Sequence, residues 1–381
     1  MLLFRWSQTI GRLGLPPTND KPFLMAMIGG TTGNRLVSGR ARWALLSSIV
    51  LIAGFADWTR AQAEETFSAV AKDVQAIFEN NKDAIVKIES EDGLSRLMGT
   101  GFFVSPTGMI YTSYHVAGES TDIVAEFGDK RYPARRLVAD IRSGIAILKI
   151  EAVTPWIPLG NSDEIVTASG VVILGFPLDQ SVTPNYGVVG GLDHGRENRY
   201  FATTLIRANI AAQRGEEGAP LLDLDGHVVG IVVGSVDDRT ACYALPIKAA
   251  EKVRSDYTRF GEIRQGWVGV TAVDNEQTEH ESKLVIRGID ENSPAHIAGL
   301  QTGDILLSIG GMKIHSTSDL PNACFFLTVD QKIPITVFRA GQEVQVDVVP
   351  TQAQPGTVSG AAYAPGYLIN SDSSLRLRIE N

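Results

Sequence analysis

Between residues 84 and 245 the sequence consists of short apolar segments separated by turn signals. The segments are rich in Val and Ile, which favours strands over helices. The turns, such as 105–108 and 224–227, carry Pro, Gly and Asp. Repeated short strands with frequent turns predict a closed antiparallel β structure, either a barrel or a sandwich. The predicted strands include 85–88, 101–104, 110–112, 145–148, 171–174, 228–233 and 242–245.

The rest of the chain divides into a leader, a second domain and a tail. A helix is expected over 67–78 and another over 246–259. A second domain begins near residue 264, with strands expected at 267–271, 283–289, 304–309, 334–339 and 343–348. Short helices are expected after Pro294 and near 317–327. From Thr351 onward Gly, Ala, Ser and Pro predominate, which predicts a flexible tail over 351–381.

The N-terminus has the three-part pattern of a secretory signal peptide. Arg40 and Arg42 precede an apolar run over 43–55, and Ala61-Gln62-Ala63 offers a small-x-small cleavage site. The run is short for a membrane span. We expect residues 1–63 to be an N-terminal extension and signal peptide removed after Ala63, with an uncleaved membrane anchor as the alternative.

Charge and composition limit the partners and cofactors. A net charge of −9 argues against nucleic acid and against an anionic membrane surface. Six His and two Cys leave little material for a metal cluster, so we expect no metal and no cofactor. Cys242 and Cys324 are expected in separate domains, which predicts no disulfide framework.

One turn carries the most specific motif of the chain. Its residues are Gly215-Glu216-Glu217-Gly218-Ala219-Pro220-Leu221. The segment resembles the Gly-Asn-Ser-Gly-Gly-Pro-Leu turn that holds the nucleophile in the HtrA (DegP-like) family of trypsin-like serine proteases. The resemblance implies that Glu217 stands in the place of the serine and that 215–217 are a remnant of the oxyanion turn. Arg214, Glu216 and Ala219 also depart from the family pattern. Ala219 adds a Cβ where the family has glycine, so we expect strain if the backbone there is glycine-specific.

Two further segments resemble the other parts of the family's catalytic triad. Residues 112–117, after the segment 99–110, resemble the histidine turn and imply that His115 is the remnant base. Residues 140–150 resemble the aspartate strand, but Gly144 occupies the position of the orienting aspartate. Asp140 lies four residues earlier, too far along an extended chain to replace it.

Acyl transfer by serine needs the hydroxyl, the histidine, the orienting carboxylate and backbone oxyanion donors together. A carboxylate is a poor peptidase nucleophile, and its charge opposes a developing oxyanion. The sequence therefore predicts a pseudoprotease. One alternative is that His115 and Glu217 form a different acid–base or metal site, and another is that they are only an ion pair filling an abandoned cleft.

The second domain resembles the PDZ module of the same family. Residues 293–311 match its core, and Gly266-Trp267-Val268-Gly269-Val270 occupies the place of the carboxylate-binding loop. The resemblance implies that a peptide C-terminus binds to these N–H groups while the peptide adds a strand to the sheet edge.

The resemblance implies a mainly β fold: a trypsin-like double β-barrel over 64–262, followed by an α+β PDZ domain over 263–350. It also implies a periplasmic or secreted protein that binds polypeptides or protein C-termini as a scaffold, chaperone-like factor or regulator. The alternative function is an active serine-type endopeptidase of protein quality control. The family commonly forms trimers, so a homotrimer or assembly with an active relative is a further expectation.

Overall fold

The computed structural model describes residues 70–91, 95–193, 202–235, 240–277, 280–352 and 374–375. The predicted signal peptide and its cleavage site after Ala63 lie outside these residues. None of the helices within these ranges combines the length and the apolar character that crossing a membrane requires.

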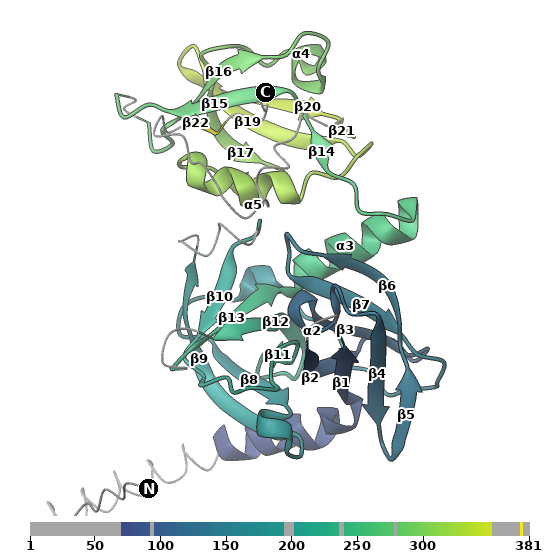
Figure 1. The fold of residues 1–381 in the computed structure, drawn as a ribbon. Coiled ribbons are helices and arrows are strands. Elements are labelled where there is room, and N and C mark those ends of the chain that lie inside the picture. Colours follow the sequence, from purple (N-terminus) through teal and green to yellow (C-terminus); the bar gives the residue numbers. More distant parts are fainter. Residues whose placement is uncertain are drawn as a thin grey trace, which may run out of the picture. The chain divides into compact units, whose positions relative to one another are not determined.

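The first part of the protease-like domain is a seven-stranded antiparallel sheet (Figure 1). Its strand order is β5-β4-β1-β2-β3-β7-β6. In this first sheet β5 and β6 stand at the two ends of the strand order, whereas the second part of the domain closes into a barrel. The mainly β fold predicted from the sequence is confirmed. The strands are β1 Ile85–Glu91, β2 Arg96–Phe103, β3 Met109–Ser113, β4 Asp122–Phe127, β5 Lys130–Pro133, β6 Arg135–Asp140 and β7 Ile145–Lys149.

The second part is a closed barrel in the order β10-β13-β12-β11-β8-β9. A buried cluster that includes Phe102, Tyr111, Leu174 and Leu245 joins residues of the first sheet and of the barrel. These residues come from segments that the apolar pattern had marked as strands. The strands are β8 Gly170–Gly175, β9 Thr183–Asp193, β10 Leu205–Ala208, β11 Pro220–Leu222, β12 Val228–Ser235 and β13 Cys242–Pro246.

The helices of this domain are few. Residues 70–81 are helical, as expected from the spacing of the apolar residues, and Ile77 is buried in the core. Helix α3, Ile247–Phe260, buries Ile247, Ala250 and Val253 and ends at a left-handed glycine. The remaining short helices are η1 Lys82–Ala84, α2 Tyr114–Ala117, η2 Ser162–Glu164 and η3 Pro177–Asp179.

The second domain is built around a sheet in the order β20-β19-β17-β16-β15-β22, with β18 paired to β17. Its core includes Leu284, Ile286, Leu306 and Val337.

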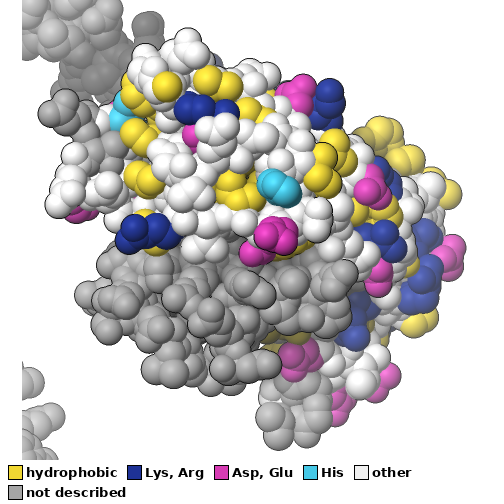
Figure 2. All heavy atoms as spheres, turned by 90° about the horizontal axis from the view of Figure 1, so that it is seen from above, with side chains coloured by type: hydrophobic (Ala, Val, Ile, Leu, Met, Phe, Trp, Pro, Cys, Tyr) yellow, Lys and Arg dark blue, Asp and Glu magenta, His cyan; other side chains and the backbone are white. Residues whose placement is uncertain are grey.

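On the face shown in Figure 2, basic, acidic and hydrophobic side chains of the described residues are interspersed. The elements are β14 Gly266–Trp267, β15 Val270–Asp274, β16 Leu284–Ile289, α4 Pro294–Ala298, β17 Ile305–Ile309, β18 Met312–Lys313, η6 Thr317–Asp319, α5 Leu320–Phe325, β19 Ile333–Arg339 and β20 Gln342–Val348.

Two features of this domain differ from the sequence prediction. The strand expected at 267–271 is two strands, because Gly269 has φ +79° and breaks the extended backbone between β14 and β15. The tail expected from Thr351 contributes two short strands. Thr351–Gln352 (β21) pairs with β14, and Ser374–Leu375 (β22) pairs with β15.

Candidate functional site

His115 lies at the junction of a strand and a short helix. Strand β3 ends at Ser113, whose side chain accepts a hydrogen bond from the N–H of Val116 and so caps α2. The cap turns the chain immediately before His115. The imidazole is left 70% exposed in a cleft of about 210 Å³. The predicted base therefore faces solvent from a well-fixed backbone.

The turn that carries Glu217 is fixed by two glycines with left-handed backbones. Gly215 has φ +97° and Gly218 has φ +85°. A Cβ on Gly215 would lie 2.3 Å from the carbonyl oxygen of Phe176, and one on Gly218 would lie 2.1 Å from that of Thr100. Both positions need glycine for conformation and for space.

Ala219, in contrast, has no positive φ. Its side chain is fully buried in the barrel core. Its Cβ therefore causes no strain of the glycine type, so the concern that a glycine-specific backbone is needed there is not supported. The substitution is accommodated as an ordinary buried methyl group.

Glu217 and His115 face each other across the cleft. The Oε2 atom of Glu217 lies 3.8 Å from Nε2 of His115, beyond hydrogen-bond distance. Burial raises the pKa of the Glu217 carboxyl, and the neighbouring His115 partly opposes this rise. The pair is a loose electrostatic contact, and the glutamate has no short hydrogen bond to the imidazole.

Glu216 is fully buried beneath the same turn. Its carboxylate accepts hydrogen bonds from Nδ2 of Asn185 at 2.6 Å and from the N–H of Gln213 at 2.6 Å. Burial raises the pKa of this carboxyl, while the two hydrogen bonds lower it. Glu216 thus helps to fix the 213–217 turn from inside and does not face the cleft.

The backbone donors of this turn have a specific arrangement. The N–H of Glu216 donates to the carbonyl of Gln213, and the carbonyl of Glu217 accepts from the N–H of Thr100. Within the described ranges, the N–H groups of Gly215 and Glu217 donate no hydrogen bond. These are the two donors that an oxyanion would use in a turn of this kind. The carboxyl side chain of Glu217 now stands on the same turn.

Gly144 lies beside the histidine turn. Its carbonyl accepts a hydrogen bond from the N–H of Tyr114 at 2.7 Å, next to His115. Gly144 has φ +76° and no side chain to orient an imidazole. Asp140 is occupied elsewhere, because its carboxylate accepts from Nε of Arg142 and from the N–H of Ser143. No carboxylate within the described ranges hydrogen-bonds the His115 ring.

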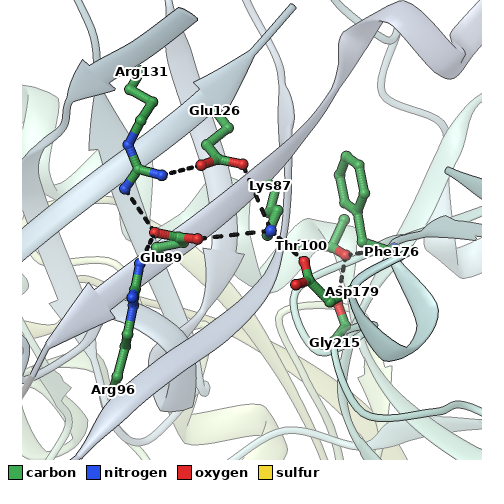
Figure 3. Close-up of polar contacts among 9 residues, drawn as sticks. All are labelled: Lys87, Glu89, Arg96, Thr100, Glu126, Arg131, Phe176, Asp179 and Gly215. Atoms are coloured by element: carbon green, nitrogen blue, oxygen red, sulfur yellow. Dashed lines mark hydrogen bonds and ion pairs between the residues drawn. The ribbon is translucent and has the colours of Figure 1, made fainter. Parts of the chain in front are cut away.

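Thr100 is a site residue that sequence reasoning missed. Its Oγ1 donates to the carbonyl of Gly215 at 2.7 Å and accepts from the N–H of Phe176 at 3.1 Å (Figure 3). It thereby joins the 213–217 turn to the loop that contains η3. A threonine on a buried strand gives no sequence signal for such a bridge.

A charged network adjoins this bridge (Figure 3). Lys87 on β1 pairs with Asp179 on η3, and it also lies 3.7 Å from Glu89. Hydrogen bonds from Arg131 and Arg96 lower the pKa of the Glu89 carboxyl to about 2 despite its burial. The network connects the first sheet to the η3 loop.

The predicted carboxylate-binding loop combines a strand and a turn. Gly266 and Trp267 form β14, and Val270 begins β15. The carbonyls of Val268 and Gly269 accept from the N–H groups of Ala295 and Asp290. Within the part of the chain that the structure describes, the N–H groups of Val268 and Gly269 donate no hydrogen bond. The loop therefore offers donors to a ligand.

The structure offers one grouping of metal-ligand types within the described residues. Asp223, Asp225 and His227 have ligand atoms within 4.8 Å of one another. They lie in the turn between β11 and β12, where Asp223 accepts from the N–H groups of the other two. The grouping is explained by this turn and lies outside the His115 cleft.

Two family models match the chain. A trypsin-like peptidase domain matches residues 99–231, and a PDZ domain matches residues 266–349. The matched segments contain His115, Gly144 and Glu217 in the first and Val268 to Val270 in the second.

Curated relatives carry the name "Probable periplasmic serine endoprotease DegP-like". The protein of Hahella chejuensis is 30% identical over 297 residues, which cover 74% of this chain and 63% of the relative. That of Chlamydia pneumoniae is 29% identical over 280 residues, covering 70% and 57%. The chain thus spans less than two thirds of the length of these relatives.

Solved structures show the same fold. The HtrA-type protease AlgW with tripeptide has a TM-score of 0.60 at 23% identity, covering 74% of this chain and 98% of that chain. AlgW with decapeptide has a TM-score of 0.57 at 21% identity, covering 74% and 99%. The serine endoprotease from Yersinia pestis has a TM-score of 0.52 at 22% identity, covering 74% and 98%.

Proposed function

We propose that this chain, which is similar to DegP-like proteases and matches a trypsin-like peptidase domain and a PDZ domain, binds polypeptides without hydrolysing them. One observation carries the proposal. The side chain that faces His115 from the turn between Gly215 and Gly218 is the carboxylate of Glu217. A carboxylate there has no hydroxyl to deliver and places negative charge beside the oxyanion donors.

The position of Gly144 supports the same proposal. In a serine protease the orienting carboxylate holds the imidazole in its tautomer and stabilises the imidazolium. Gly144 touches the backbone of the His115 turn but brings no such group. The cleft then lacks the hydroxyl that would give up a proton, and it lacks the carboxylate that would orient His115 to accept it.

The PDZ domain supplies the retained activity in this proposal. A peptide with a free C-terminus would place its carboxylate on the N–H groups of Val268 and Gly269 and add its backbone to the edge of β15. The AlgW protease has been solved with a tripeptide and with a decapeptide, which supports peptide ligands for this fold. The protein then acts as a scaffold, a chaperone-like factor or a regulator.

We place this function in the periplasm, after export. The leader pattern over residues 40–63 and the word periplasmic in the names of the relatives support this location. The location agrees with a role in binding exported polypeptides.

Peptide binding by the full chain tests the retained activity. A peptide with a free C-terminal carboxylate is compared with the same peptide amidated, by calorimetry. The acid should bind at least tenfold more tightly, because the amide removes the anionic acceptor from buried donors. Equal affinities would contradict this mode of binding.

A fluorophosphonate probe tests the proposed loss of hydrolysis, since it labels any activated serine whatever the substrate preference. We expect no labelling of the full chain. Ser235 also lines this cleft, and among the described lining residues it alone has a side-chain hydroxyl. Labelling that disappears in Ser235→Ala would reveal a displaced nucleophile and overturn the proposal.

A further inference from the structure

The C-terminal segment of the chain pairs with the PDZ sheet. Strand β22 is antiparallel to β15, with Leu375 opposite Ala272 and Ser374 opposite Val273. In the sheet, β22 is the last strand and β15 is its neighbour. Without β22, strand β15 would be the edge of the sheet, which is the edge that β-strand addition requires.

The direction of β22 is that of a C-terminal peptide ligand. From Ser374 to Leu375 the chain moves from opposite Val273 to opposite Ala272, toward the loop that begins β15. A peptide whose carboxylate reached Val268 and Gly269 would also have to run antiparallel to β15. An external peptide and the chain's own segment therefore need the same backbone groups in the same orientation.

The sequence around β22 has strand character of its own. The order Leu375-Arg376-Leu377-Arg378-Ile379-Glu380 alternates apolar and charged residues, which is the period of a strand with one apolar face. The preceding residues 355–366 are rich in Gly, Ala and Pro and have no such period. The alternation therefore begins at the segment that pairs with β15.

Covalent geometry permits this pairing within one chain. Gln352 pairs with Gly266 on β14, four residues before β15 begins at Val270. The 353–373 segment could span about 70 Å if fully extended, which is ample for a return to β15. A tethered segment of this kind acts at an effective concentration in the millimolar range.

We propose that the C-terminal segment around Ser374–Leu375 is an intramolecular ligand of the PDZ domain, which an external polypeptide must displace from β15. The pairing follows from the structure alone, but its effect on ligands rests on the proposed function. That effect is that external peptides bind more weakly to the intact chain than to a chain whose own segment cannot pair. The pairing itself is testable without any partner.

Disulfide trapping tests the pairing. In a full chain with Cys242 and Cys324 replaced by alanine, Val273→Cys and Ser374→Cys create directly opposed positions. Opposed residues of antiparallel strands have Cα atoms about 4.5–5.5 Å apart, which suits a disulfide. The matched control combines Val273→Cys with Leu375→Cys, a position opposite Ala272 that falls on the other face of the strand.

We expect mild oxidation to cross-link the opposed pair at least tenfold faster than the control, at a rate independent of protein concentration. Circular dichroism confirms that both variants are folded. Equal rates for the two pairs, or a rate that grows with protein concentration, would overturn the proposal.

A binding experiment tests the competition. Ser374→Pro/Leu375→Pro in the full chain removes both N–H groups of β22, so whichever one faces β15 is lost. The control is Ala361→Pro/Ala362→Pro in the preceding segment. The probe is a labelled synthetic peptide of residues 369–381 with a free carboxylate, followed by fluorescence anisotropy.

We expect this peptide to bind the Ser374→Pro/Leu375→Pro chain at least tenfold more tightly than the natural chain or the control. Equal, measurable affinities for all three would overturn the competition. If the cross-link forms selectively but neither acid nor amide peptides bind, the proposed function fails while the intramolecular pairing stands. The two failures are therefore distinguishable.

Discussion

At the scale of single residues, Glu217 and Gly144 set what the cleft can do. The scaffold around them retains the features that chemistry would need: a capped turn under His115, two left-handed glycines and two backbone N–H donors. The nucleophile and the orienting carboxylate are each missing at one position, Glu217 and Gly144. We therefore expect that the missing groups can be restored.

The first prediction is a partial recovery in Gly144→Asp/Glu217→Ser. The serine supplies the hydroxyl and the aspartate orients His115, so a fluorophosphonate probe should label the double variant. Each single change should give no labelling, because the members of a triad act as a unit. Gly144 has φ +76°, so the aspartate costs about 1 kcal/mol of stability. A folded double variant that stays unlabelled would contradict the assignment of Gly144 or Glu217.

The second prediction concerns the turn that presents Glu217. Gly218→Ala meets both a left-handed backbone and the Thr100 carbonyl at 2.1 Å, so it should destabilise the fold by about 3 kcal/mol. Gly128→Ala is the matched control, because Gly128 has φ +59° but open space around it. It should cost about 1 kcal/mol. Urea unfolding measures both, and equal losses would show that the close approach to Thr100 does not matter.

At the scale of elements, the network around Glu89 joins strands that are distant in sequence. Lys87 and Glu89 come from β1, Glu126 from β4 and Arg131 from β5 (Figure 3). Through Asp179 the network also reaches the η3 loop, whose Phe176 N–H meets Thr100 below the Glu217 turn. The position of the turn therefore depends on the first sheet as well as on the barrel.

The third prediction is a pH-dependent role for Glu89. Its folded pKa of about 2 lies below the ordinary value, so its ion pairs stabilise the fold above about pH 4.3. That stabilisation is lost as the pH falls from there through 2. Glu89→Gln should lower the stability at pH 7 by about 2 kcal/mol and much less at pH 2.5. Glu126→Gln, at a more exposed acid, is the control and should have a smaller effect.

Thermal melts across this pH range measure the difference. An equal loss for Glu89→Gln at pH 7 and pH 2.5 would mean that the ionised carboxylate is not what stabilises the network.

The sequence predicted an element correctly where a single apolar strand or a recognisable turn marked it locally. Strands β1, β3, β7, β8, β12 and β13 fall on their predicted segments, and α3 begins within one residue of its expected start. The break between β14 and β15 was missed, because a valine-rich run hides the left-handed Gly269. Contacts that depend on tertiary placement had no local signal. Examples are the burial of Glu216 on Asn185 and the Thr100 bridge.

At the scale of the whole molecule, the two candidate binding surfaces differ in what they retain. The protease-like cleft keeps its His115 turn and its backbone donors but presents a carboxylate. The PDZ domain keeps its loop donors, while its sheet edge is paired with β22. We therefore propose a polypeptide-binding protein whose peptidase domain serves as a scaffold. Its own C-terminal segment regulates the access of peptides to β15.

The measurement that tests this account most directly is hydrolysis of an unfolded protein by the natural chain. The purified full chain is incubated with unfolded casein beside His115→Ala, and the fragments are followed by mass spectrometry. We expect no fragments above those seen with His115→Ala, because Glu217 supplies no hydroxyl and Gly144 supplies no orienting carboxylate. Fragments that survive repeated purification and are absent with His115→Ala would contradict it.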